Sequence, residues 1–169
     1  MGNKSIYLLD TMVILSGFYR AHNRKFITTS KVRNEVWHRN PSKIDILLVT
    51  NQLEILDPEP QYVKKAITHS RTLGEEGKLS DSDISLIALA MQLRDSNKEV
   101  IVFTDDYSIQ NVLKSLGIVY KPITSLGIRK MFKWKYVCVA CKSSFSRKVE
   151  ICPKCGSKIV RLPEEIKNH

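Results

Sequence analysis

The chain has 169 residues, of which 43% are hydrophobic and 26% are charged, a balance typical of a folded globular protein rather than a disordered one. Nothing in it resembles a signal peptide or approaches the ~18 apolar residues of a membrane helix, so we expect a soluble, cytoplasmic protein with no membrane partner. The net charge of +10 points to an anionic partner, and nucleic acid is the commonest one.

Strands and helices are expected to alternate along the first part of the chain. Apolar runs predict strands at 6–9, 26–28, 53–56, 100–103 and 118–120. Apolar residues at helical spacing predict helices at 11–20, 30–37, 44–49, 62–73, around 84–95 and 107–116. This alternation predicts an α/β fold, with a parallel sheet flanked by helices. The pattern ends near residue 125, which predicts a first domain over residues 1–124.

The composition changes after residue 124. Residues 1–124 hold 16 Lys and Arg against 14 Asp and Glu, whereas residues 125–169 hold 11 against 3. We expect a basic, aromatic linker over 125–135, whose rings could stack on bases or only pack against the first domain. The residues expected to bind RNA are Arg129, Lys130, Phe132, Lys133, Trp134, Lys135, Lys142, Arg147 and Lys148.

The cysteines form two C-x₂-C pairs, Cys138 with Cys141 and Cys152 with Cys155. Each such pair folds into a tight knuckle, and two knuckles supply four thiolates in a tetrahedron, which suits Zn²⁺. Four thiolates leave no open position for water, so the single zinc ion predicted here is structural. We therefore predict a small zinc-ribbon domain over 136–162 with its own core, followed by a flexible tail over 163–169.

Several carboxylates stand where strands end or helices begin. They are Asp10, Asp83, Asp105 and Asp106, and Glu35 joins them from within the helix predicted at 30–37. Because parallel strands end at the same edge of a sheet, we expect these acids to converge there. Gathered carboxylates resist ionisation unless a cation joins them, and Mg²⁺ or Mn²⁺ is the natural partner. Such an ion activates water and stabilises in-line displacement at a phosphodiester.

Each of three acids also has a purely structural interpretation. Asp10, Asp83 and Asp106 could cap the helices that follow them. Glu35 has no capping role because it lies in the middle of a helix. Asp105 and Asp106 stand side by side, and a single helix cap needs only one of them. The combination therefore favours a catalytic role for the set.

Four segments resemble, in chain order, the motifs of PIN-domain nucleases: LLDTMVIL, NEVW, LSDSDISLIALA and VFTDDYSIQNV. The resemblance implies a PIN-like fold that cleaves single-stranded RNA with Mg²⁺ or Mn²⁺. It implies that Asp10, Glu35, Asp83 and Asp106 bind the catalytic metal, with Asp105 an open alternative to Asp106.

The combination of this domain with a four-cysteine ribbon resembles the archaeal "Nin-one-binding" endonucleases. That resemblance implies an endoribonuclease that forms the 3′ end of small-subunit ribosomal RNA, with the precursor RNA and the pre-small-subunit particle as partners. One alternative is a toxin-like PIN ribonuclease that acts on other RNA, although such toxins usually lack a ribbon. Another is a non-catalytic, RNA-binding ribosome assembly factor, against which the retained acids argue.

Overall fold

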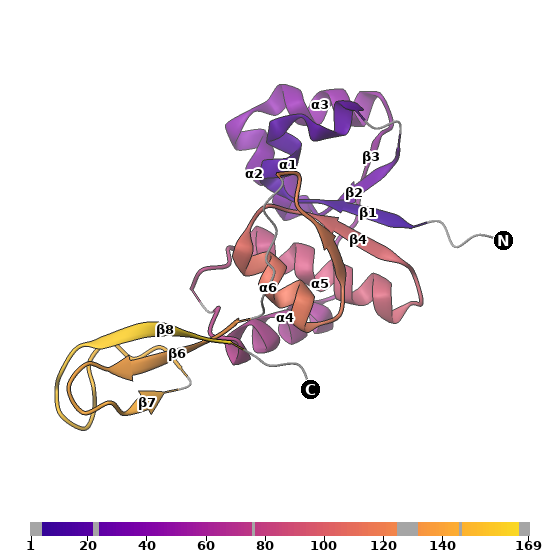
Figure 1. Cartoon of the computed structure of the whole chain (residues 1–169). Helices are drawn as coiled ribbons and strands as arrows, with labels where there is room; N and C mark the ends of the chain where they lie inside the picture. Colours follow the sequence, from indigo (N-terminus) through magenta and orange to yellow (C-terminus); the bar gives the residue numbers. More distant parts are fainter. Residues whose placement is uncertain (1–4, 22–23, 76, 125–131, 146, 166–169) are drawn as a thin grey trace.

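Five short parallel strands form the main sheet of the computed structural model, in the order β3-β2-β1-β4-β5 (Figure 1). The structure describes residues 5–21, 24–75, 77–124, 132–145 and 147–165. The strands of this sheet are β1 (Ile6–Leu9), β2 (Phe26–Thr28), β3 (Leu53–Ile55), β4 (Val100–Phe103) and β5 (Val119–Lys121). All four neighbouring pairs are parallel, which confirms the predicted sheet.

Helices cover both faces of this sheet. They are α1 (Thr11–Ser16), α2 (Ser30–Arg39), α3 (Pro41–Val49), α4 (Pro60–Thr72), α5 (Asp81–Asp95) and α6 (Tyr107–Ser115). Figure 1 shows α1 to α3 on one side of the sheet and α4 to α6 on the other. Right-handed crossovers require this division, because the chain first moves outward from β1 to β3 and then returns past β1 to β4.

Three boundaries differ from the sequence predictions for identifiable reasons. The helix predicted at 11–20 ends at Ser16, because Gly17 takes up a left-handed conformation with φ of 79° and closes it. A short 3₁₀ turn, η1 (Phe18–Ala21), follows. Pro41 and Pro60 each stand at the start of a helix, where their missing N–H has no cost, so α3 and α4 begin earlier than predicted.

The core lies between the sheet and its helices. Buried side chains such as Leu8, Leu9 and Val102 come from the central strands, and Leu86, Ile87 and Leu89 come from α5. Valine and isoleucine dominate β4, and all four of its residues are buried, as a central parallel strand requires. Among the described residues, no helix combines the length and apolar character needed to cross a membrane.

A second, antiparallel sheet carries the cysteines, in the order β7-β6-β8. Its strands are β6 (Phe132–Cys138), β7 (Ser144–Phe145) and β8 (Ile159–Glu165). Pairing between β6 and β8 runs from Phe132 with Glu165 to Cys138 with Ile159. The structure therefore corrects two expectations: residues 132–135 of the expected linker and residues 163–165 of the expected tail belong to strands. Residues 125–131 and 166–169 lie outside the described part of the chain.

An ion pair between described residues joins the small sheet to the first domain. Arg161 of β8 donates to the backbone oxygen of Gly74, and its Nη2 lies 3.2 Å from Oε2 of Glu75. The side chain of Glu75 is only 2% exposed, and its Oε1 accepts a hydrogen bond of 2.9 Å from Asn111. The hydrophobic core cluster of the described residues lies within the first domain, and a buried carboxylate of that domain pairs with an arginine of the small sheet.

We predict that Arg161→Ala destabilises the first domain as well as the ribbon. The substitution takes the cation away from a buried carboxylate, which typically costs ~3 kcal/mol or more. Urea denaturation, followed by circular dichroism, measures the change in the free energy of unfolding.

The double variant Arg161→Ala/Glu75→Gln is expected to recover part of this loss, because no charge then remains buried. Arg147→Ala, an exposed arginine of the same module, serves as the control and should stay within ~0.5 kcal/mol of wild type. If Arg161→Ala unfolds at the wild-type urea concentration, the ion pair does not link the two parts.

Candidate active site

The predicted acids gather around the carboxyl ends of β1 and β4. Asp10 directly follows β1 and caps α1, and Asp106 follows β4 by three residues and caps α6. Asp83 lies in the first turn of α5, and Glu35 lies in the middle of α2. Contacts between α2 and α5 bring the last two acids together across the edge of the sheet. The electrostatic interactions of Asp10 and Asp83 reach the other acids of this group, hereafter the acid cluster: Asp10, Glu35, Asp83 and Asp106.

Asp10 is the buried member of the acid cluster, with 4% of its surface exposed. Its Oδ1 accepts a hydrogen bond of 2.6 Å from the backbone N–H of Thr11, as a helix cap does. Its Oδ2 accepts a hydrogen bond of 2.8 Å from Thr104 Oγ1. Thr104 Oγ1 in turn accepts a hydrogen bond of 3.1 Å from the backbone N–H of Asp106. One hydroxyl therefore links the two acids that follow β1 and β4.

Glu35 is held by two further hydroxyls. Its Oε2 accepts hydrogen bonds from Thr11 Oγ1 at 3.0 Å and from Ser82 Oγ at 2.6 Å. Its Oε1 lies 2.9 Å from Nη2 of Arg39, one turn further along α2. These contacts tie α2 to the first turns of α1 and α5, so the fold itself places the Glu35 carboxylate.

The capping interpretations of the other two acids are also correct. Asp83 Oδ2 accepts hydrogen bonds from the backbone N–H and the hydroxyl of Ser80, which completes a capping box. Asp106 Oδ1 accepts from the backbone N–H groups of Ser108 and Ile109. A carboxylate has about four acceptor positions, so a cap leaves room for a further ligand. Capping and catalysis are therefore compatible at the same residues.

Two carboxyl groups of the acid cluster, Asp10 and Asp83, have raised pKa values. Burial raises the pKa of Asp10 from 3.8 to about 7, and the charges of Asp83 and Asp106 push it in the same direction against the hydrogen bonds from Thr104 and Thr11. Burial also raises the pKa of Asp83, and the charges of Asp106 and Glu35 add to that effect. Carboxyl groups that resist ionisation in this way favour a cation among them.

The structure separates Asp105 from the acid cluster. Its Oδ1 accepts hydrogen bonds from the backbone N–H groups of Ile123 and Thr124 and from the Thr124 hydroxyl, at 2.9 to 3.1 Å. Asp105 thus anchors the chain after β5. Asp106, by contrast, interacts with both Asp10 and Asp83. This placement favours Asp106 as the fourth acid of the set.

Sequence reasoning did not identify the side chains that hold the acids: Thr11, Arg39, Ser82 and Thr104. Thr104 stands between a buried strand and two aspartates, and Thr11 and Ser82 are each adjacent in sequence to an acid. That adjacency is the only signal the sequence offers. Arg39 carries none, because a basic residue four positions after a glutamate is common on any helix.

The acid cluster suits a hard divalent cation that keeps part of its water shell. Among the described residues, the group of three or more side chains whose ligand atoms converge closely enough to hold an ion is the four cysteines, with all ligand atoms within 4.8 Å of one another, and not the acids. Mg²⁺ and similar ions usually bind one or two carboxylates directly and retain several waters, so such an ion does not need all four acids as direct ligands.

The four cysteines meet as predicted. Cys138 Sγ lies 3.4 Å from Cys155 Sγ, and Cys141 Sγ lies 3.6 Å from Cys152 Sγ. Hydrogen bonding with Ser157 lowers the pKa of Cys155 to about 6, whereas burial raises the pKa of Cys152 to about 11. Four sulfurs at these separations can hold one tetrahedral metal ion.

The structure describes four of the residues expected to bind RNA. Lys135 lies within β6, and Lys142, Arg147 and Lys148 are exposed around the cysteine cluster. Phe132, Lys133 and Trp134 belong to β6, but their side chains lie outside the described residues, as do Arg129 and Lys130 altogether. The exposed basic groups give the small module a positively charged surface.

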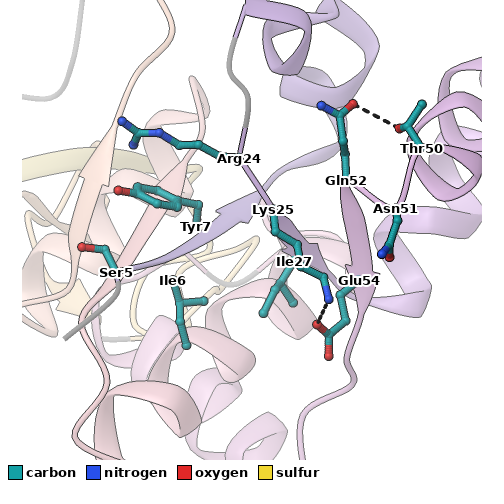
Figure 2. A pocket seen from close by; sticks show the side chains of 10 residues that line it. All are labelled: Ser5, Ile6, Tyr7, Arg24, Lys25, Ile27, Thr50, Asn51, Gln52 and Glu54. Carbon is teal, nitrogen blue, oxygen red and sulfur yellow. Dashed lines mark hydrogen bonds and ion pairs between the residues drawn. The ribbon is translucent and has the colours of Figure 1, made fainter. Parts of the chain in front are cut away.

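A cavity of about 570 Å³ lies away from the acids. It is formed where β1, β2 and β3 begin, at the opposite edge of the sheet (Figure 2). Arg24 lies over the ring of Tyr7 at 4.9 Å, and Lys25 pairs with Glu54 at 3.1 Å. The Arg24 and Lys25 side chains that line this cavity thus already have partners, and none of the predicted acids lines it.

Residues 7–93 match the model of the PIN domain of ribonuclease, which includes three of the four acids and more than half of the chain. The chain belongs to the PIN-domain ribonucleases. This nuclease is therefore a hydrolase that acts on RNA, and the predicted PIN-like α/β fold is confirmed.

Several relatives match nearly the whole nuclease. Endoribonuclease Nob1 of Methanothermobacter thermautotrophicus is 34% identical over 91% of this chain and 91% of its own. Endoribonuclease Nob1 of Pyrococcus abyssi is 31% identical over 92% of each chain. Ribonuclease VapC1 of Thermoplasma acidophilum is 30% identical over 92% of this chain and 77% of its own. Because these matches extend beyond the PIN domain, they include the cysteine-bearing module.

We predict that the nuclease without added divalent cations loses stability as the pH rises from about 4 to about 7. Over this range the folded Asp10 keeps a proton that the unfolded chain has lost, so ionisation favours unfolding. Asp10→Asn mimics the protonated acid and should not show this loss. The two proteins should therefore diverge by on the order of a few kcal/mol between pH 5 and pH 8.

Urea denaturation at four pH values provides the measurement. Added Mn²⁺ should restore the stability of the wild type at pH 8 but have less effect on Asp10→Asn. A constant difference between the two proteins at every pH would show that Asp10 ionises normally.

Proposed function

We propose that this nuclease is a metal-dependent endoribonuclease that cleaves single-stranded precursor ribosomal RNA and so forms the 3′ end of small-subunit rRNA. The observation that carries the proposal is the acid cluster at the carboxyl edge of a PIN sheet, in a chain that matches endoribonucleases Nob1 along more than nine-tenths of its length. Its partners would be the precursor RNA and the pre-small-subunit particle.

Asp10, Glu35, Asp83 and Asp106 would hold Mg²⁺ or Mn²⁺. Such an ion activates water and stabilises the charge of an in-line phosphodiester displacement. The chain's own residues prepare the site: Thr104 orients Asp10 and the start of α6, while Thr11 and Ser82 orient Glu35. Held in place by hydroxyls, the carboxylates need little rearrangement to receive a cation.

The small module would hold one structural Zn²⁺ through Cys138, Cys141, Cys152 and Cys155. Four sulfurs within 4.8 Å of one another support this assignment. A module of about thirty residues buries too little surface to fold alone, so metal binding supplies folding free energy. Lys135, Lys142, Arg147 and Lys148 would then present a rigid basic surface to RNA phosphates.

A second candidate is a nuclease that acts on other RNA. The match to Ribonuclease VapC1 over 92% of this chain favours it, because that relative also extends past the PIN domain. Comparing the cleavage of precursor ribosomal RNA with the cleavage of other RNA distinguishes the two candidate functions.

We predict metal-dependent cleavage of a labelled RNA that spans the 3′ end of small-subunit rRNA. Asp10→Asn and Asp106→Asn should each lower the rate at least ~100-fold, because each removes a charge that the metal requires. Asp105→Asn is the matched comparison and should retain most of the activity, because Asp105 contacts residues 123–124 rather than the acid cluster.

Gel analysis with and without Mn²⁺ gives the rates. Equal cleavage of unrelated messenger RNA would favour the second candidate. Absence of cleavage under every condition would leave an RNA-binding assembly factor as the function.

We also predict that the triple variant Lys142→Ala/Arg147→Ala/Lys148→Ala binds RNA more weakly and with a shallower salt dependence. Each lost phosphate contact should reduce the slope of log affinity against log salt by ~0.7 for single-stranded RNA. Fluorescence anisotropy at several salt concentrations measures both quantities.

Wild type and the triple variant should each contain one zinc per chain by metal analysis, which shows that the module remains folded. Zinc-free wild-type protein, purified without chelators, would refute the structural zinc site. An unchanged salt slope would assign RNA binding to other residues.

A further inference from the structure

Arg39 lies beside the acid cluster but has no part in the mechanism described above. It stands one turn after Glu35 on α2, and its Nη2 lies 2.9 Å from Glu35 Oε1. Its side chain is 54% exposed, compared with 31% for Glu35. Its other terminal nitrogen is 3.8 Å from Met12 Sδ, a weak acceptor. The guanidinium is thus positioned at the rim of the site by a single strong contact.

That contact occupies Oε1 of Glu35. Oε2 already accepts hydrogen bonds from Thr11 and Ser82. A cation that binds Glu35 through Oε1 therefore competes with Arg39 for it. Positive charges also repel, so metal binding and the Arg39–Glu35 pair oppose each other.

The incoming substrate supplies Arg39 with a replacement partner. Four carboxylates repel an RNA phosphate, so its approach requires positive charge at the rim as well as the metal. A guanidinium offers two parallel N–H donors that match the oxygens of a phosphate. A residue with this chemistry, half exposed and adjacent to the acids, is placed to meet the phosphate that is cleaved.

We propose that Arg39 is a phosphate-binding residue of the nuclease: it pairs with Glu35 in the metal-free protein and with an RNA phosphate once the cation binds. This inference rests on the proposed endoribonuclease function. The competing explanation is an ordinary surface pair four residues apart on a helix, which contributes only a few tenths of a kcal/mol to stability. The two explanations differ in what they predict for RNA and metal affinity.

The test compares Arg39→Ala and Arg39→Lys with wild type, and uses Arg33→Ala as the matched control. Arg33 lies on the same helix, but its guanidinium stacks over the Trp37 ring at 5.6 Å instead of meeting an acid. RNA affinity is measured by anisotropy with Ca²⁺ in place of Mg²⁺, on RNA verified to be uncut. Mn²⁺ affinity is measured separately without RNA, by titration calorimetry.

We expect Arg39→Ala to weaken RNA binding about tenfold and to reduce the salt slope by ~0.7, the effect of one lost phosphate contact. Mn²⁺ should bind more tightly to this variant, because a competitor for Glu35 is gone. Arg39→Lys should show an intermediate RNA affinity, since an ammonium cannot bind in the bidentate manner. Arg33→Ala should change the RNA affinity less than ~twofold.

RNA affinity and salt slope unchanged in Arg39→Ala would overturn the proposal, whatever happens to Mn²⁺ binding. Equal losses in Arg39→Ala and Arg33→Ala would also overturn it, because the effect would then be one of net charge on α2. If the wild type itself neither binds nor cleaves RNA, it is the proposed function that fails.

Discussion

The burial of carboxylates beside one another at one edge of the sheet is the constraint on which the rest of this structure depends. Parallel strands bring Asp10 and the Asp106 turn side by side, and the meeting of α2 with α5 adds Glu35 and Asp83. Burial and these neighbouring charges raise the pKa of Asp10 to about 7. Such a site disfavours ionised carboxylates, and a divalent cation bound there would stabilise them, so the proposed metal binding would be linked to folding stability at the same residues.

Hydroxyl groups and one guanidinium stabilise the carboxylates of the acid cluster. Thr104, Thr11 and Ser82 donate to the acids without adding charge, so they hold the carboxylates in place and leave them available to an ion. Arg39 does add charge, from a half-exposed position beside Glu35. The small sheet supplies a similar partner to another buried acid, because Arg161 neutralises Glu75 of the first domain. Each buried or crowded carboxylate thus has a partner suited to its role.

Much of this architecture could be predicted because it depends on local patterns. The VIVF run of β4 could only be a buried strand, and the spacing of the two C-x₂-C pairs was enough to predict that four sulfurs meet. Element boundaries were less predictable. The end of α1 depends on the left-handed conformation of Gly17, and the extents of β6 and β8 depend on their pairing with each other, although the cysteine knuckles separate them in the chain.

The sequence by itself determined which groups this protein carries: the acids, the thiols and the basic C-terminal third. Those properties follow from residue type and short spacing, which do not change on folding. The tertiary structure decided how they are used. It placed Asp106 with the acid cluster and turned Asp105 toward residues 123–124, although the two are adjacent. It also joined Arg161 to Glu75 across 86 positions. Such choices depend on contacts between distant segments, which exist only after the backbone has packed.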